Sequence, residues 1–224
     1  VEVEAVEPLA LKGKSERVAA YRLVSANGLD GNVRRVDTPL TGRDEELATL
    51  AQAWDEVITG RVVRLVTVIG DAGMGKSRLI HEVVRRYGAS ANVLRGRCLP
   101  YGDGITFWPL VEMASAHISA DESPEQAQAR LLELTGDADV AARLASAIGL
   151  SSVAYPLHEL NWAARRFLQS LAAHQPVIAV IDDIHWAEQA FLELLEHVLD
   201  EARDSPILLL ASARHELIEE HPNW

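Results

Sequence analysis

The sequence has only one cysteine, Cys98, so no intrachain disulfide can form. A chain without disulfides is typical of a reducing compartment, and the cytoplasm is the expected location. No apolar run approaches the length of a membrane-spanning helix, and the opening V-E-V-E-A-V-E is acidic where a secretory signal would be basic. We therefore expect no membrane partner.

Positive charge is also scarce. Against 33 Asp and Glu there are 21 Lys and Arg, which gives a net charge of −12. Because surfaces that bind nucleic acid need clustered cations, direct nucleic-acid binding by this segment is not expected. The 224 residues, 48% hydrophobic and 24% charged, have the composition of a globular chain with one main core. The start at Val1 suggests a piece of something longer.

Three regions differ in pattern. Residues 1–25 predict a small β appendage, since V-E-V-E-A-V alternates at period two and R-V-A-A-Y-R-L-V supplies a second strand. Residues 26–39 are rich in Gly, Asn, Asp and Pro and predict a linker. Residues 40–224 alternate strand-length apolar runs with helical patterns, which predicts an α/β fold with a doubly wound parallel sheet.

Within residues 40–224 the elements can be placed from caps and periodicity. Thr41 is expected to open a helix whose Leu47, Leu50, Trp54, Val57 and Ile58 share one face and which Gly60 ends. Three helices are expected after Phe107 and Trp108, with a capping box at 123–126 and a cap at Asp137. Strands are expected over 62–69, 92–97, 177–181 and 207–211, and further helices from the glycine loop to Gly88 and over 188–203.

The stretch G-D-A-G-M-G-K-S completes the spacing G-x-x-x-x-G-K-S between a strand and a helix. Its glycines let backbone N–H groups face one concavity, and the helix N-terminus adds its positive dipole end. Lys76 is expected to reach the outer phosphates and to act in catalysis, and Ser77 to ligate Mg²⁺. Chance alone gives the pattern in about one chain in a hundred of this length. The candidate nucleotide-binding residues are Gly70, Ala72, Gly73, Met74, Gly75, Lys76, Ser77 and Arg78.

Two aspartates follow the apolar strand V-I-A-V-I. Residues at the carboxyl end of a parallel strand point into the crevice where ligands bind. Asp182 is expected to hold Mg²⁺ through water, and Asp183 to orient and deprotonate the attacking water. The alternative is that the pair only caps a helix. His185 and Trp186, which follow, are expected to be structural.

The last strand, I-L-L-L-A, ends in Ser212 and Arg214. A polar group there can sense the γ-phosphate or hold the water, and Arg214 can neutralise transition-state charge; a solvated arginine is the alternative. The eight histidines show no ligand spacing, so no zinc site is expected.

Four motifs follow one another along the sequence. They are L-T-G-R-D-E-E-L, the glycine loop, I-D-D-I-H-W and S-A-R. Together, from Leu40 to the end, they resemble the AAA-type ATPase of STAND signalling proteins. The resemblance implies a P-loop NTPase with an AAA-like three-layer α/β/α core that binds ATP or ADP with Mg²⁺. In that family the G-R box, here Gly42 and Arg43, lies against the base and sugar, and residues matching Asp183 and Arg214 serve hydrolysis and phosphate sensing.

Two further segments extend the resemblance. Residues 96–110 are similar to the corresponding segment of bacterial regulators that join this ATPase to nucleotide cyclase or LuxR-type DNA-binding domains. Residues 1–25 resemble the closing strands of a class III adenylate or guanylate cyclase domain. No cyclase activity is expected from so short a piece. Members of the family continue into a fifth strand and a helical lid, and this chain is expected to be truncated before both. Without the fifth strand beside it, strand 62–69 is expected at an open edge of the sheet.

Two functions remain open from the sequence. One is a slow Mg²⁺-dependent ATPase that acts as an ATP/ADP switch in a multidomain bacterial signalling or transcription regulator; the other is a binding-only nucleotide sensor that regulates an attached cyclase domain. A fragment that binds nothing is disfavoured by the intact Lys76 and the paired aspartates. The implied partners are ATP, the attached cyclase domain and downstream helical-repeat or effector domains, and a nucleotide-dependent oligomer is left open.

Overall fold

The computed structural model describes residues 2–9, 18–25, 40–100, 106–119 and 121–224. The chain divides into two units, residues 1–39 and 40–224. In the first unit, β1 (Glu2–Leu9) pairs antiparallel with β2 (Val18–Ser25), which confirms two strands in this region. The expected linker, 26–39, lies outside the described residues.

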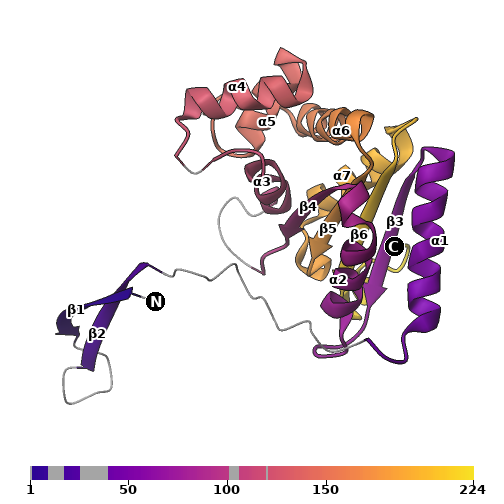
Figure 1. Cartoon of the computed structure of the whole chain (residues 1–224). Coiled ribbons are helices and arrows are strands. Elements are labelled where there is room, and N and C mark those ends of the chain that lie inside the picture. The colour runs from indigo at the N-terminus through magenta and orange to yellow at the C-terminus, as the bar shows by residue number, and fades with distance from the viewer. Residues whose placement is uncertain (1, 10–17, 26–39, 101–105, 120) are drawn as a thin grey trace. The chain divides into compact units, whose positions relative to one another are not determined.

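The second unit is built on a parallel sheet of four strands in the order β3-β6-β5-β4 (Figure 1). The strands are β3 (Val63–Ile69), β4 (Asn92–Arg97), β5 (Val177–Asp182) and β6 (Ile207–Ala213). Among the described strands, β3 pairs only with β6 and forms one edge. The predicted α/β fold with a parallel sheet is confirmed.

Helices cover both faces of this sheet (Figure 1). On one face α1 (Asp44–Gly60) and α2 (Lys76–Tyr87) pack on Ile178, Val180, Leu208 and Leu210. On the other, α3 (Trp108–Ser115), α6 (Leu157–His174) and α7 (Gln189–Glu201) pack on the alternate residues of the same strands. Because both faces are buried, β5 and β6 are continuous apolar runs, and the core has three layers.

Between β4 and β5 the described residues form four helices, rather than the expected three: α3, α4 (Pro124–Thr135), α5 (Ala138–Ala147) and α6. The predicted caps are confirmed, since Ser123 Oγ accepts from the amide of Gln126 at 3.3 Å and Asp137 Oδ1 from that of Asp139 at 2.9 Å. The unexpected helix is α3, which lies so close to β4 that a Cβ on Gly96 would come within 2.4 Å of the Pro109 carbonyl oxygen.

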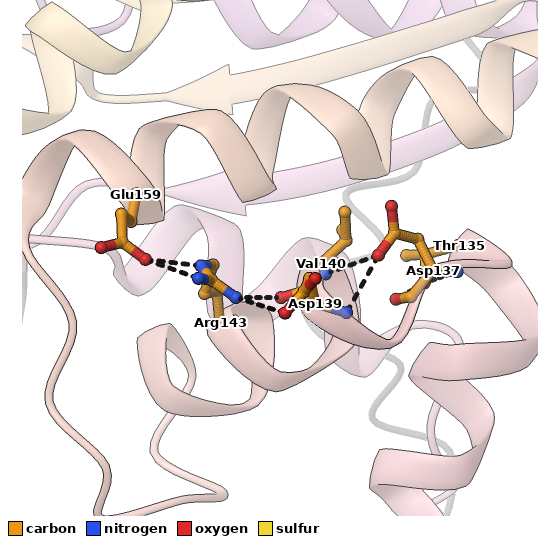
Figure 2. Close-up of polar contacts among 6 residues, drawn as sticks. All are labelled: Thr135, Asp137, Asp139, Val140, Arg143 and Glu159. Atoms are coloured by element: carbon orange, nitrogen blue, oxygen red, sulfur yellow. Dashed lines mark hydrogen bonds and ion pairs between the residues drawn. The ribbon is translucent and has the colours of Figure 1, made fainter.

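An arginine joins the third and fourth of these connecting helices, α5 and α6. Arg143 on α5 donates to Glu159 on α6 at 2.7 Å and to Asp139 at 3.1 Å (Figure 2). Its guanidinium also lies 4.8 Å from the ring centroid of Tyr155 and 5.7 Å from that of Trp162. Two carboxylates and two aromatic faces therefore hold one cation at the junction of α5 and α6.

Two expectations for the first helix were wrong. α1 begins at Asp44 after Arg43, and Thr41 does not cap it because Gly42, at φ +73°, turns the chain between Thr41 and the helix. Ile58 is 39% exposed, since it lies about 100° around the helix from the fully buried Val57. The helix ends at Gly60 as predicted, and Arg61 takes the left-handed conformation that follows.

The remaining described elements are short. They are the 3₁₀ turns η1 (Gly88–Ser90) and η2 (Ile184–Trp186), and helix α8 (Glu216–Glu220). No helix in the described part of the chain is both long and apolar enough to cross a membrane.

Candidate functional site

The glycine loop connects the carboxyl end of β3 to the first turn of α2. The amide of Gly70 donates to the carbonyl of Ala213 at 3.2 Å, which fixes the start of the loop to the end of β6. Gly73 (φ +83°) and Gly75 (φ +85°) adopt left-handed backbone that a side chain would strain, and this conformation lets the loop curl back before the helix. Ala72, Met74 and the other residues of 71–75 are exposed, so the loop is accessible to a ligand.

The first residues of α2 carry the polar side chains of the loop. The Lys76 ammonium donates to the carbonyls of Gly70 at 2.6 Å and Asp71 at 3.0 Å, which folds its side chain back over the loop. Ser77 is exposed in the first helical turn, and Arg78 is half-buried. A bound phosphate chain would compete with these two carbonyls for the ammonium.

Arg43 brings the G-R box to this loop. Its guanidinium donates to Glu46 Oε1 at 2.5 Å and to the carbonyl of Met74 at 3.0 Å. This hydrogen bond with Arg43 holds the pKa of the Glu46 carboxyl below its usual value. The segment before α1 and the phosphate loop, thirty-one residues apart in the sequence, are therefore in direct contact.

A pocket of about 290 Å³ opens between α1, β3 and the loop. Its lining combines apolar residues of β3, such as Val66 and Val68, with polar residues that include Arg43, Glu46, Thr49 and Thr67. Its volume is close to the lower end of the range for small-molecule sites. Glu46 and Thr67 were not among the predicted site residues. Glu46 could have been found, because it lies three residues after Arg43 and so on the same side of a helix. Thr67 gives no signal in the sequence.

The two aspartates lie where β5 meets β6. Because Ile181 pairs with Ala211, Asp182 comes beside Ser212. The Ser212 hydroxyl donates to Asp182 Oδ1 at 3.1 Å and accepts from the amide of Asp183 at 3.1 Å. Since a hydroxyl has one proton, Ser212 is engaged in orienting Asp182 and does not have that proton for a phosphate oxygen.

The structure shows different features at the two aspartates. Burial, reinforced by the charge of Asp183, raises the pKa of the Asp182 carboxyl above its ordinary value. Asp183 takes the left-handed conformation (φ +57°) at the start of η2, and its side chain makes no capping hydrogen bond. The helix-cap alternative for Asp183 therefore finds no support in the geometry.

His185, which was expected to be structural, is 8% exposed and lies in the turn η2 that follows the two aspartates. Burial lowers the pKa of its ring. Arg214 follows β6 and is half-buried. The start of the loop, the end of β5 and the end of β6 are joined by hydrogen bonds, since Gly70 bonds to Ala213 and Ser212 bonds to both aspartates.

The donor set suits magnesium better than a transition metal. No group of three or more His, Cys, Asp or Glu within the described ranges is arranged to hold a metal by itself. The Ser77 hydroxyl and the Asp182 carboxylate are hard oxygen donors, and Mg²⁺ is usually held by one or two such groups together with phosphate oxygens and waters. These two residues are the ones that would hold it.

A family model for the AAA ATPase domain matches residues 39–210. The chain belongs to the AAA ATPase domain family. The match runs from before α1 into the first half of β6 and includes the glycine loop, and members of this family generally bind and hydrolyse ATP. An uncharacterized protein of Rhizobium meliloti (strain 1021) is 30% identical over 198 residues, which are 80% of this chain and 19% of that protein. The matched part of the chain thus spans about a fifth of the length of that relative.

Proposed function

We propose that residues 40–224 bind Mg²⁺-ATP and hydrolyse it slowly, as an ATP/ADP switch in a multidomain bacterial signalling or transcription regulator of the STAND type. The observation that supports the proposal is that hydrogen bonds join the start of the glycine loop to the end of β6, and the end of β6 to both aspartates, at the carboxyl edge of the sheet. Ligands of open parallel sheets bind at this edge.

Each residue has a role in this proposal. The backbone of residues 70–78 holds the phosphates, and Lys76 exchanges its two carbonyl contacts for phosphate oxygens. Ser77 and Asp182 hold Mg²⁺, which when bound neutralises phosphate charge. Gly42 and Arg43 place the base and sugar in the pocket beside β3.

The chemical step is the attack of water on the γ-phosphorus. Asp183 accepts the proton of this water as the oxygen–phosphorus bond forms and the bond to ADP breaks. Arg214, which follows β6, neutralises the charge that develops on the γ-phosphoryl oxygens. Ser212 keeps Asp182 oriented through its hydrogen bond.

The second candidate is a binding-only sensor that regulates an attached cyclase domain. In this proposal the contacts of Lys76 with the carbonyls of Gly70 and Asp71 couple binding to the loop, because ADP or ATP displaces them and so changes the loop conformation. The attached cyclase domain and downstream helical-repeat or effector domains are its proposed partners.

Binding and turnover separate these proposals. Fluorescent ATP and ADP analogues are titrated with and without Mg²⁺ against the wild type, Lys76→Ala and the control Arg61→Ala, whose guanidinium pairs with Asp204. We expect Lys76→Ala alone to lose binding. Asp183→Asn should lower phosphate release by about 10²-fold or more and keep binding. A strong ADP preference with no phosphate release would favour the sensor, and loss of binding in Asp183→Asn would refute its role as base.

A further inference from the structure

The indole of Trp224 bonds to the strand that leads into the phosphate loop. Its Nε1–H donates to Thr67 Oγ1 at 3.0 Å, although the two residues are 157 positions apart in the sequence. The ring is half-buried and packs against the core beneath α7. Among the described strands β3 pairs only with β6, so this hydrogen bond is made to the edge strand of the sheet. Thr67 comes three residues before Gly70, where the phosphate loop begins.

A continuous series of backbone hydrogen bonds connects Trp224 to Arg214. The amide of Leu217 donates to the carbonyl of Arg214 at 3.3 Å. The amide of His221 donates to the carbonyl of Leu217 at 2.8 Å, and the amide of Trp224 donates to the carbonyl of His221 at 3.0 Å. Because each bond holds the next turn of the chain, residues 214–224 form one unit, the strap.

The chain is attached to β3 at both ends of the strap. Just before the strap, the carbonyl of Ala213 accepts from the amide of Gly70 at 3.2 Å, and at its end Trp224 bonds to Thr67. Between these points Leu217 is 1% exposed and lies in the core. Apolar packing is non-directional, so Leu217 alone does not fix the rotation of the strap. A hydrogen bond has a preferred angle, and the one to Thr67 fixes it.

We infer that Trp224 is a positioning residue, which through its bond to Thr67 holds the strap in the orientation that brings Arg214 to the γ-phosphate. This inference rests on the proposed function, in which Arg214 neutralises charge on the γ-phosphoryl oxygens. ADP has no γ-phosphate. The contact between Trp224 and Thr67 therefore strengthens the binding of ATP and leaves that of ADP unchanged.

Variants that remove only the polar part of the contact test this role. Trp224→Phe keeps an aromatic ring without the N–H, and Thr67→Val keeps the shape of the side chain without the hydroxyl. The measurement is the ratio of the affinity for a non-hydrolysable ATP analogue to the affinity for ADP, both with Mg²⁺. We expect each variant to lower this ratio by about two- to tenfold. The Kd for ADP should stay within about twofold of the wild-type value.

Arg214→Ala shows whether the effect passes through the arginine. This variant should lower the same ratio, and adding Trp224→Phe should lower it no further, because the residue to be positioned is gone. A purely structural role of Trp224 would lower the melting temperature and leave the ratio unchanged. Trp162→Phe and Thr59→Val are the matched controls and should keep the wild-type ratio. Trp162 is a half-buried tryptophan on α6, and the Thr59 hydroxyl bonds to the carbonyl of Asp55 within α1.

Three outcomes would overturn the inference. A lowered ratio in Arg214→Ala with wild-type ratios in Trp224→Phe and Thr67→Val removes the role of Trp224 and leaves the proposed function intact. A further loss when Trp224→Phe is added to Arg214→Ala shows that Trp224 does not act through the arginine. If Arg214→Ala itself keeps the wild-type ratio, the role proposed for Arg214 fails and this inference fails with it.

Discussion

The guanidinium of Arg43 donates a hydrogen bond to the carbonyl oxygen of Met74 at 3.0 Å. This contact joins Met74, in the phosphate loop, to the segment before α1. Arg43 and Met74 line the same pocket. The loop's conformation thus depends on a residue outside the glycine motif.

Replacing Arg43 should therefore weaken nucleotide binding. The loss of this hydrogen bond in Arg43→Ala is expected to raise the Kd for ATP and ADP alike by roughly two- to tenfold, or about 0.5–1.5 kcal/mol. Equilibrium titration checks the prediction, with Arg61→Ala as the control. Equal affinities in wild type and Arg43→Ala would show that the contact does not support binding.

The raised pKa of Asp182 predicts that its substitution increases stability while it impairs Mg²⁺-dependent nucleotide binding. At neutral pH the folded state holds a carboxylate that burial disfavours, so Asp182→Asn should raise the melting temperature of the protein without nucleotide. As pH falls below the ordinary value of 3.8, the carboxyl is protonated in folded and unfolded chains alike, and the gain should disappear. The same variant should lose the Mg²⁺ dependence of nucleotide binding.

Calorimetry at several pH values checks this, with the exposed Asp204→Asn as the control. A lower melting temperature of Asp182→Asn at pH 7 would mean that the hydrogen bond from Ser212 outweighs the cost of burial.

Cys98 should be inert in the folded protein. The side chain is 4% exposed, and burial, with the charges of Asp183, Glu112 and Asp182, raises its pKa to about 12. Because the thiolate is the reactive form, iodoacetamide at pH 8 should modify the native protein far more slowly than the urea-unfolded chain. Mass spectrometry of timed samples measures both rates, and equal rates would contradict the buried position.

Gly96→Ala should destabilise the fold. A Cβ at this position lies 2.4 Å from the Pro109 oxygen, so β4 and α3 must separate. Overpacking of this kind costs about 1–3 kcal/mol in the free energy of unfolding. Denaturant unfolding checks the value, and Gly60→Ala, whose added Cβ meets only ordinary contacts at 3.5 Å or more, is the matched control.

Local patterns predicted the parts of the site that depend on neighbours in the sequence. The strand before Gly70, the helix after Ser77 and the aspartates after β5 follow from apolar runs and glycine spacing. The rest depends on contacts between distant segments. The pocket needs α1 beside β3, α3 needs the close approach at Gly96, and the hydrogen bond between Ser212 and Asp182 needs β5 and β6 side by side.

The hydrogen bond between Ser212 and Asp182 also depends on the register in which β5 and β6 pair. The two side chains meet because β5 and β6 align Ile181 with Ala211. A slip of one residue would turn each side chain of the strand to the opposite face and separate the pair. A copy with such a slip would therefore lack the arrangement of Asp182 and Ser212 on which the proposed Mg²⁺ site depends.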